Sequence, residues 1–222
     1  MYCSITFKER FVTIFLFFVA TCFLFSGCAW FQPEKEETAY ELAVEGMDAF
    51  KDGDYVYSME LFQKLKDRYP FSKYAILAEL KIADCRYHRK EYEDAIFWYE
   101  EFEKLHPENE AVPYVIYQTG LCYLEQLDTI DRDQTPAQQA RKIFEKIVRH
   151  YPQSEYSNAA RQHIKICVKS LAEHDFYVGF FYYKSKHYKA ALERFGSVVR
   201  DYPDVGVHYK ALRYIPLCRA KL

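Results

Sequence analysis

The sequence is poor in the patterns from which catalytic and nucleotide-binding sites are built. It has only seven glycines, and none of them belongs to a phosphate-binding glycine loop. Its seven histidines are dispersed, and neither a His-Glu-x-x-His nor a Gly-x-Ser-x-Gly motif occurs. A formal net charge of −2 offers no strongly basic face for a nucleic acid. We therefore expect a protein that is not an enzyme, that holds no metal or dissociable cofactor, and that does not bind nucleic acid.

The chain also has only one long apolar run, close to its start. Two basic residues precede an apolar stretch of 15 residues, 11–25, which is shorter than the ~20 residues of a membrane span. Ser26-Gly27-Cys28 follows, and this arrangement resembles a bacterial lipobox. The pattern predicts a lipoprotein signal peptide over residues 1–27, a covalent lipid on Cys28 and a lipidated tether over 28–37. The alternative is an uncleaved signal anchor that continues past the cysteine.

Four prolines mark a tandem repeat: Pro70, Pro107, Pro152 and Pro203, each preceded by an aromatic ring. The residues eight positions earlier are Phe62, Tyr99, Phe144 and Phe195, and those twelve positions earlier are Ser58, Ala95, Ala140 and Ala191. This spacing is the signature of the tetratricopeptide repeat, a pair of helices of ~34 residues. We predict an all-α solenoid of helical hairpins, with about nine or ten helices in four or five repeats, the last incomplete. The repeats divide into residues 38–150 and 151–222.

Small residues mark the close contacts within each predicted hairpin. Gly46 should face Ser58, and Ala83 should face Ala95, because a larger side chain would hold the two helices apart. Gly53 lies in the first turn, where it can adopt a left-handed conformation. The equivalent turn, Arg89-Lys90-Glu91-Tyr92, lacks glycine, so we expect modest strain there.

The cysteines follow the same register. Cys85, Cys122, Cys167 and Cys218 each lie fifteen residues after one of the four prolines. Equivalent positions in stacked repeats are too far apart for the ~7 Å Cα separation that a disulfide allows. We predict four free thiols that pack as small buried apolar groups, rather than disulfides or a metal site.

Two segments break the period. The first is an inserted loop, residues 128–135, after which Thr135 should cap a new helix. Its three aspartates lack the spacing of a calcium loop, which favours a solvated loop. The second is an extra amphipathic helix over 154–171, whose packing partner the register does not assign. After Pro203 we expect only one helix, broken at Pro216.

The first helix of each repeat lines the concave side of such a stack. Around its small residue, the first three repeats place a set rich in aromatic side chains: Tyr40, Met47, Phe50, Leu77, Asp84, Tyr87, His88, Tyr114, Tyr117 and Leu121. Aromatic rings offer a large contact area at low rotamer cost, so this set predicts a groove for an extended peptide. The alternative is that several of these residues pack against the neighbouring helix.

Three ordered motifs carry a family resemblance: Asp131-Arg132-Asp133-Gln134-Thr135 ahead of Ala140 and Phe144, Tyr151-Pro152-x-Ser154-x-Tyr156 followed by Ala159-Ala160, and Arg200-Asp201-Tyr202-Pro203-Asp204. Together with the lipobox, they resemble the BamD family, the lipoproteins of the outer-membrane β-barrel assembly machinery. The resemblance covers residues 28 to about 215.

The resemblance implies a non-enzymatic scaffold on the periplasmic face of the outer membrane, held there by its lipid. Ala29 after the lipid cysteine is similar to an outer-membrane sorting signal. Repeats 38–150 would receive unfolded outer-membrane proteins, and repeats 151–222 would dock on the periplasmic domains of the central barrel protein. Arg194 could pair with an acidic residue of that partner, or it could be a solvated helix arginine. Accessory lipoproteins are possible further partners. The alternative is another tetratricopeptide lipoprotein, such as a pilus-assembly pilotin or a cell-division coordinator.

Overall fold

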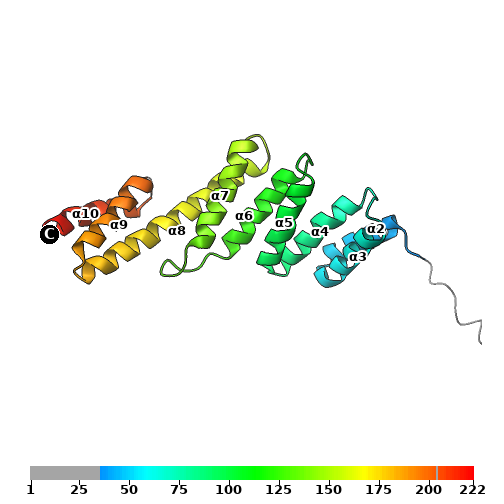
Figure 1. Cartoon of the computed structure of the whole chain (residues 1–222), viewed down its shortest axis with the longest axis horizontal. Helices are drawn as coiled ribbons and strands as arrows, with labels where there is room; N and C mark the ends of the chain where they lie inside the picture. Colours follow the sequence, from blue (N-terminus) through cyan, green and yellow to red (C-terminus); the bar gives the residue numbers. More distant parts are fainter. Residues whose placement is uncertain (1–35, 204) are drawn as a thin grey trace, which may run out of the picture. The chain divides into compact units, whose positions relative to one another are not determined.

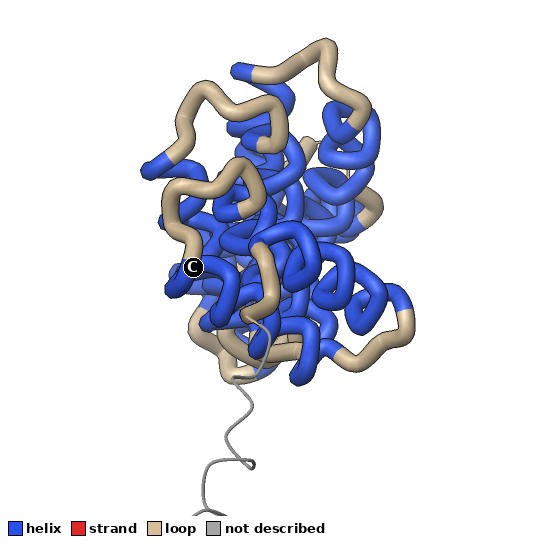
Figure 2. The backbone as a smooth tube through the Cα atoms, turned by 90° about the vertical axis from the view of Figure 1, so that its right-hand side faces the viewer, coloured by secondary structure: helices blue, strands red, loops and turns tan. Residues whose placement is uncertain are grey.

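A computed structural model describes residues 36–203 and 205–222. The predicted signal peptide, Cys28 and all but the end of the tether lie outside the described residues. Residues Ala39–Leu222 form one compact unit. Within the described part of this unit, the regular structure is nine α-helices, α2 to α10, and no strand (Figures 1 and 2).

The helices follow one another as antiparallel hairpins. In chain order they are α2 (Ala39–Lys51), α3 (Tyr55–Arg68), α4 (Ala75–His88), α5 (Tyr92–Leu105), α6 (Val112–Glu125), α7 (Thr135–His150), α8 (Tyr156–Lys184), α9 (Tyr188–Asp201) and α10 (Val207–Arg219). Each helix packs against the next one, and α8 also contacts α6 and α10. The predicted all-α hairpin solenoid is therefore confirmed. We call α2, α4, α6 and α8 the A helices, and α3, α5, α7 and α9 the B helices.

The four prolines end the four B helices in the same way. The residues before them, Tyr69, His106, Tyr151 and Tyr202, are the C-caps, with φ between −134° and −128° and ψ between 52° and 59°. A proline disfavours helical geometry in the residue before it, so the chain must leave the helix at this point. The four prolines thus mark the same backbone conformation in each repeat.

The small residues lie where the prediction placed them. The Ser58 hydroxyl donates a hydrogen bond to the Gly46 carbonyl oxygen at 2.8 Å, across the first hairpin. In the third hairpin, a Cβ atom on Gly120 would lie 2.6 Å from Cε1 of the buried Phe144 ring. In the first, third and last hairpins, the aromatic ring of the B helix therefore occupies the space that the glycine leaves open.

Three of the four turns from A helix to B helix have a left-handed residue. Gly53 has a φ of +81°, as expected for glycine. Lys90 and Lys186, at the same place in the second and last hairpins, have a φ of 63°. A lysine in this conformation is strained, so the expected strain is present, and it occurs in two turns rather than one.

The segment after Pro152 corrects a prediction. Instead of a separate helix over 154–171, α8 runs without interruption through all 29 of its residues. The positions at which the register would place a turn are occupied by Leu171 and Ala172, which are buried and favour helix. The first half of α8 therefore packs on α6 and α7, and its second half packs on α9 and α10.

Two smaller expectations were also wrong. Thr135 is the first residue of α7 rather than its cap, and its backbone N–H and hydroxyl both donate to the Asp133 carboxylate. The α10 helix continues through Pro216 to Arg219. A proline removes only one backbone hydrogen bond, and the buried side chains of Ala211 and Cys218 hold both halves of α10 against the core.

The inserted loop is tied to α8 rather than fully solvated. Gln134 is buried, and its side-chain amide donates to the carbonyl oxygens of Thr129 and Arg132. The Ser170 hydroxyl donates to the Gln134 side-chain oxygen at 2.8 Å, and Nδ1 of His174 lies 2.6 Å from the Ile130 carbonyl oxygen. Residues 128–133 and 135 are nevertheless exposed, so the expected solvated loop is confirmed except at Gln134.

The four cysteines occupy one packing position in successive repeats, as predicted. All four are buried, and none of them is in a disulfide. Burial raises the pKa of each thiol, to about 12 for Cys122 and about 11 for Cys167. A raised pKa keeps the thiol protonated and unreactive at neutral pH.

Candidate binding groove

Helices α2, α4 and α6 carry all ten residues that the sequence assigns to a groove. Tyr40 and His88 are exposed, whereas Met47, Phe50, Leu77, Tyr87, Tyr114, Tyr117 and Leu121 are half-buried, and Asp84 is buried. Nine of the ten therefore offer surface to a ligand. Asp84 does not, and it has a structural role described below.

The first two hairpins bring three of these rings together with a fourth, Tyr55. His88 makes edge-to-face contacts with Phe50 and Tyr87, with ring centroids 5.4 Å and 5.5 Å apart. His88 also stacks on Tyr55 of α3, with ring centroids 4.7 Å apart. Ring pairs at these distances stabilise each other by ~1 kcal/mol beyond their buried area. The result is an aromatic cluster beside the turns of the first two hairpins, and it is partly open to solvent.

A second aromatic cluster joins α6 to α8. The Tyr117 ring lies 5.1 Å from Tyr156 and 5.8 Å from His163, and its hydroxyl is 3.0 Å from Nε2 of His163. Tyr114 also contacts Tyr156, at 5.9 Å. Burial lowers the pKa of His163, so the neutral imidazole is favoured.

Asp84 connects three helices through hydrogen bonds. Its Oδ1 accepts from the hydroxyls of Tyr99, at 2.7 Å, and Tyr114, at 2.9 Å. Its Oδ2 pairs with Lys81 Nζ at 2.7 Å, and the same ammonium lies 4.5 Å from the centre of the Phe50 ring. Burial, together with the negative charge of Asp84, raises the pKa of both phenols. Both tyrosines therefore remain hydrogen-bond donors, and the bond to Asp84 fixes the position of Tyr114.

The sequence prediction missed three members of these clusters. Tyr55 is the first residue of its B helix, and Tyr92 and Tyr188 occupy the same position in two other repeats. The proline register could have identified Tyr55, because Tyr55, Tyr92 and Tyr188 each lie fifteen residues before a repeat proline. Tyr156 and His163 belong to α8, whose A-helix role was not recognised. No local signal in the sequence pairs them with Tyr117.

Arg194 is neither free nor buried. Its Nη1 pairs with Asp175 Oδ1 of α8 at 2.8 Å, and 46% of its side chain remains exposed. Asp175 is mostly covered, since only 17% of its side chain is exposed. The arginine is thus held in one orientation, with part of its guanidinium open to solvent.

The chemistry of these clusters is suited to binding. Aromatic faces, a few hydroxyls and a lysine ammonium can contact a peptide with large side chains. Among residues 36–203 and 205–222, no three His, Cys, Asp or Glu side chains are grouped so that they could hold a metal ion. None of the helices in the same part of the chain combines the length and the apolar character needed to cross a bilayer.

The stacked hairpins define the class: a tetratricopeptide-like helical scaffold whose A helices carry partly exposed aromatic side chains. The family follows from comparison with known sequences. The family model YfiO, described as outer membrane lipoprotein, matches residues 34–220. The chain therefore belongs to this family.

Curated relatives are similar over most of the chain. Outer membrane protein assembly factor BamD of Caulobacter vibrioides is 29% identical over 180 residues, 78% of this chain and 59% of that protein. The protein of the same name from Vibrio cholerae is 28% identical over 182 residues, 78% of this chain and 76% of that one. That from Pasteurella multocida is 25% identical over 208 residues, 89% of this chain and 80% of that one. The chain thus spans about three-fifths of the Caulobacter relative's length.

Solved structures show more distant likeness. The TPR2AB domain of yeast Sti1 in its pHSP90 complex aligns with 82% of this chain and 70% of that one, with a TM-score of 0.47 and 15% identity. PcrH from Pseudomonas aeruginosa aligns with 63% of this chain and 98% of that one, with a TM-score of 0.40 and 19% identity.

Proposed function

We propose that the chain is a non-enzymatic lipoprotein scaffold of the outer-membrane β-barrel assembly complex, which helps to deliver, fold and insert outer-membrane proteins. Family membership supports the setting, and the relatives are named as outer membrane protein assembly factors. The observation that carries the molecular role is the row of partly open aromatic side chains along α2, α4 and α6. Unfolded barrel strands alternate apolar and polar residues, and their large side chains could fill the spaces between these rings.

The groove is tested by crosslinking a peptide from the C-terminal strand of a barrel protein to the chain. We expect the crosslinks to fall on α2, α4 and α6, and substitutions Tyr40→Ser and His88→Ser to weaken binding together by at least about tenfold. The matched control is Phe97→Ser, because Phe97 is 58% exposed but lies on a B helix. Crosslinks confined to residues after 150 would contradict the proposal.

The covalent lipid on Cys28 would place the scaffold on the periplasmic face of the outer membrane. A single acyl chain binds membranes only weakly, so several chains on one cysteine are needed for a firm anchor. Metabolic labelling with palmitate should mark the native chain, and Cys28→Ser should remove both the label and the membrane association. Label on Cys28→Ser at the native level would rule out this anchor.

The second proposed contact is docking of repeats 151–222 on periplasmic domains of the central barrel protein, through the exposed part of Arg194. Arg194→Glu should abolish co-purification with that protein. Because the change also places two carboxylates side by side, the control is the exchange Arg194→Glu with Asp175→Arg, which restores the internal pair. Docking by Arg194 predicts that the exchange stays defective, whereas recovery would show that only the internal pair matters.

A further inference from the structure

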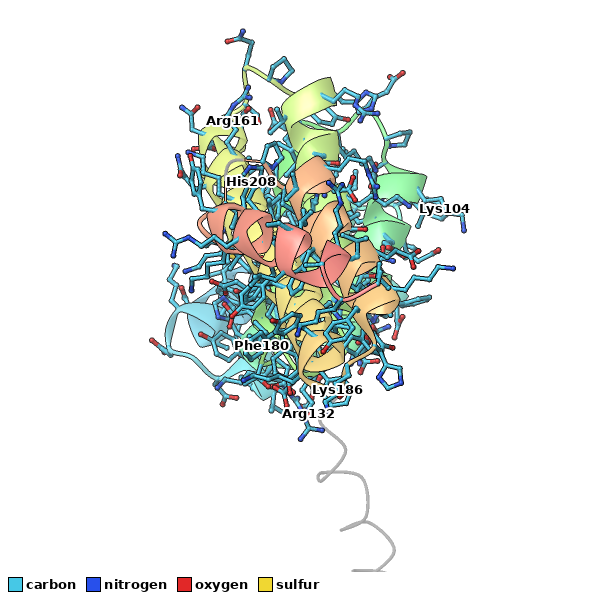
Figure 3. The ribbon with its side chains drawn as sticks, turned by 90° about the vertical axis from the view of Figure 1, so that its left-hand side faces the viewer. Lys104, Arg132, Arg161, Phe180, Lys186 and His208 are labelled. Atoms are coloured by element: carbon cyan, nitrogen blue, oxygen red, sulfur yellow. The ribbon has the colours of Figure 1, made fainter. Side chains whose placement is uncertain are left out.

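Two hollows lie along α8 and α10, apart from the aromatic groove. The first has a volume of about 580 Å³ and is lined by Ile164, Lys165, Val168 and Lys169 of α8 and by Val205 and Gly206 ahead of α10. The second has a volume of about 440 Å³ and is lined by Phe176 and Phe180 of α8 and by Lys210, Arg213, Tyr214 and Leu217 of α10. Figure 3 looks onto the α10 end of the unit and labels Phe180.

The two hollows follow one seam between parallel helices. Residue numbers rise from the first hollow to the second on both α8 and α10, so the two helices run in the same direction. On α8, the buried Ala172 lies between the two linings, and it belongs to the same core cluster as Ala211 of α10. The distance from Lys165 to Phe180 along α8 is about 22 Å at the usual rise of a helix. A ligand along this seam would therefore be about four helical turns long.

The floor of the seam is apolar. Phe180 makes edge-to-face contact with Tyr214 at 5.5 Å, and Tyr214 is 6.0 Å from Phe176. Leu217, at the end of the second hollow, is 48% exposed. Apolar side chains of a partner would remove this surface from water.

The rim of the seam carries three cations that have no carboxylate partner among the described residues. Lys165, Lys210 and Arg213 are exposed, and none of them has an ion pair with any described residue. Lys169 approaches Glu173 only at 3.9 Å. No acidic residue of the described chain lines either hollow.

Some lysines of the earlier hairpins have a carboxylate partner within the protein. Lys81 pairs with Asp84 at 2.7 Å, and Lys146 pairs with Glu103 at 2.5 Å. The three cations beside the seam have no such partner among the described residues. Like charges that lie close together repel each other, and an acidic ligand would relieve this repulsion.

We propose that the seam between α8 and α10 binds an acidic amphipathic helix of a partner protein. The apolar face of that helix would lie in the two hollows, and carboxylates beside it would pair with Lys165, Lys210 and Arg213. The geometry favours a protein helix over a lipid surface, because the apolar side chains of the seam lie in hollows that a flat bilayer surface would not fill. This surface differs from the aromatic groove, and its ligand need not be an outer-membrane protein.

The test uses the full-length chain in nanodiscs of phosphatidylcholine, a neutral lipid. The probe is a fluorescent peptide of about sixteen residues, with leucine on one helical face and glutamate elsewhere. We expect saturable binding that weakens as salt is raised. Lys210→Glu with Arg213→Glu should weaken it at least about tenfold. Lys142→Glu with Arg149→Glu makes the same charge change on exposed positions of α7 and should leave the affinity within about twofold of native.

Several results would overturn the proposal. One is an equal loss of affinity in both charge-reversed variants. Another is that the acidic peptide does not bind at concentrations up to about 1 mM. Equal binding of a peptide with lysine in place of each glutamate would also refute it. Flotation with phosphatidylglycerol vesicles that needs Lys210 and Arg213, without peptide binding, would assign the seam to a membrane surface. Concentration-dependent dimerisation that the same variant abolishes would assign it to a second copy. Peptide binding and barrel-protein delivery are separate readouts, so failure of one leaves the other standing.

Discussion

The second hairpin and the last one bury equivalent positions with different chemistry. Eight residues before its proline, the second hairpin has Tyr99, and the last has Phe195. Tyr99 donates its hydroxyl to the buried Asp84. Phe195 instead stacks on Tyr214, with ring centroids 5.2 Å apart. One core therefore holds a polar network within an apolar shell, and the other is held by apolar packing in which Phe195 stacks on Tyr214.

The difference shows that the repeat register sets the size of a buried side chain but not its polarity. Asp84 precedes Cys85, and the corresponding residues before the other three cysteines are Leu121, Ile166 and Leu217. The acid thus occurs only in the hairpin whose core ring has a hydroxyl. A buried carboxylate without donors would be costly, so the two polar residues depend on each other.

The A helices of the two regions differ in length as well. Helix α4 has 14 residues and ends at a turn, whereas α8 has 29 and passes through the position of the turn. The first three hairpins are joined by loops, while one continuous helix joins the third hairpin to the last. Motion between the third and last hairpins therefore requires bending of α8, whose buried residues pack on both sides of the junction.

High pH should separate the two regions most strongly. Burial raises the pKa of six tyrosines between residues 87 and 123, to about 12 for Tyr87. In the rest of the described chain, Tyr156 and Tyr202 are the only tyrosines whose pKa is raised. A raised pKa means that the folded chain holds the phenol proton more tightly than the unfolded chain. The stability it contributes is present below pH ~10 and is lost as the pH rises further. We expect the second and third hairpins to open first.

The cysteines provide the measurement. Brief alkylation at rising pH, read by mass spectrometry, should label Cys85 and Cys122 before Cys167 and Cys218. Simultaneous labelling of all four would show that the chain unfolds as one unit, and earlier labelling of Cys218 would reverse the predicted order.

Among single substitutions, removal of the buried carboxylate should destabilise the chain most. Asp84→Ala leaves the hydroxyls of Tyr99 and Tyr114 and the ammonium of Lys81 without their acceptor, at a cost of ~3–5 kcal/mol. Leu217→Ala is the control at the equivalent position of the last repeat, and because Leu217 is 48% exposed, it should cost ~1 kcal/mol. Urea unfolding measures both values. Similar losses for the two variants would mean that the network adds nothing to packing.

Glycine in place of Ala172 should weaken the junction between the two regions. Ala172 is fully buried within α8, so Ala172→Gly loses helix propensity and a packed methyl group, ~1–2 kcal/mol in total. The exposed position Arg161 of the same helix provides a control, where Arg161→Gly should cost ~1 kcal/mol or less. Amide hydrogen exchange should show faster exchange around residue 172 in the first variant only. Unchanged exchange there would mean that the continuity of α8 does not depend on this residue.

Much of the fold could be predicted from the sequence because the prolines are tied to backbone geometry. The same register located the close contacts of Gly46 and Gly120 and the burial of the four cysteines. It failed between Pro152 and Gly179, where the relevant signal was the lack of turn residues at Leu171 and Ala172. Reading a register shows where a turn belongs, but whether the chain turns depends on the residues that occupy the position.

The candidate groove was less predictable than the fold. Residues on one A-helix face, such as Tyr87 and His88, follow from helical periodicity. The contacts that Tyr117 makes with Tyr156 and His163 depend on how α8 packs on α6, and they join residues far apart in sequence. Asp84 is buried because Tyr99 and Tyr114, on two other helices, donate hydrogen bonds to it. Its position in the sequence shows neither partner, so it was predicted to lie in the groove.

Substitution by glycine, which should destabilise the chain at Ala172, should stabilise it at the turns. Lys90 and Lys186 hold a left-handed conformation that costs a lysine ~1–2 kcal/mol, whereas a glycine adopts it freely and loses ~0.5–1 kcal/mol of chain entropy on folding. Lys90→Gly and Lys186→Gly should therefore each stabilise the chain by ~0.5 kcal/mol. Gly53→Ala is the converse control, because its added Cβ would meet no atom within 4 Å and only the backbone strain remains. It should destabilise by a similar amount in urea unfolding. Destabilisation by Lys90→Gly would show that contacts of the lysine side chain outweigh the strain of its backbone.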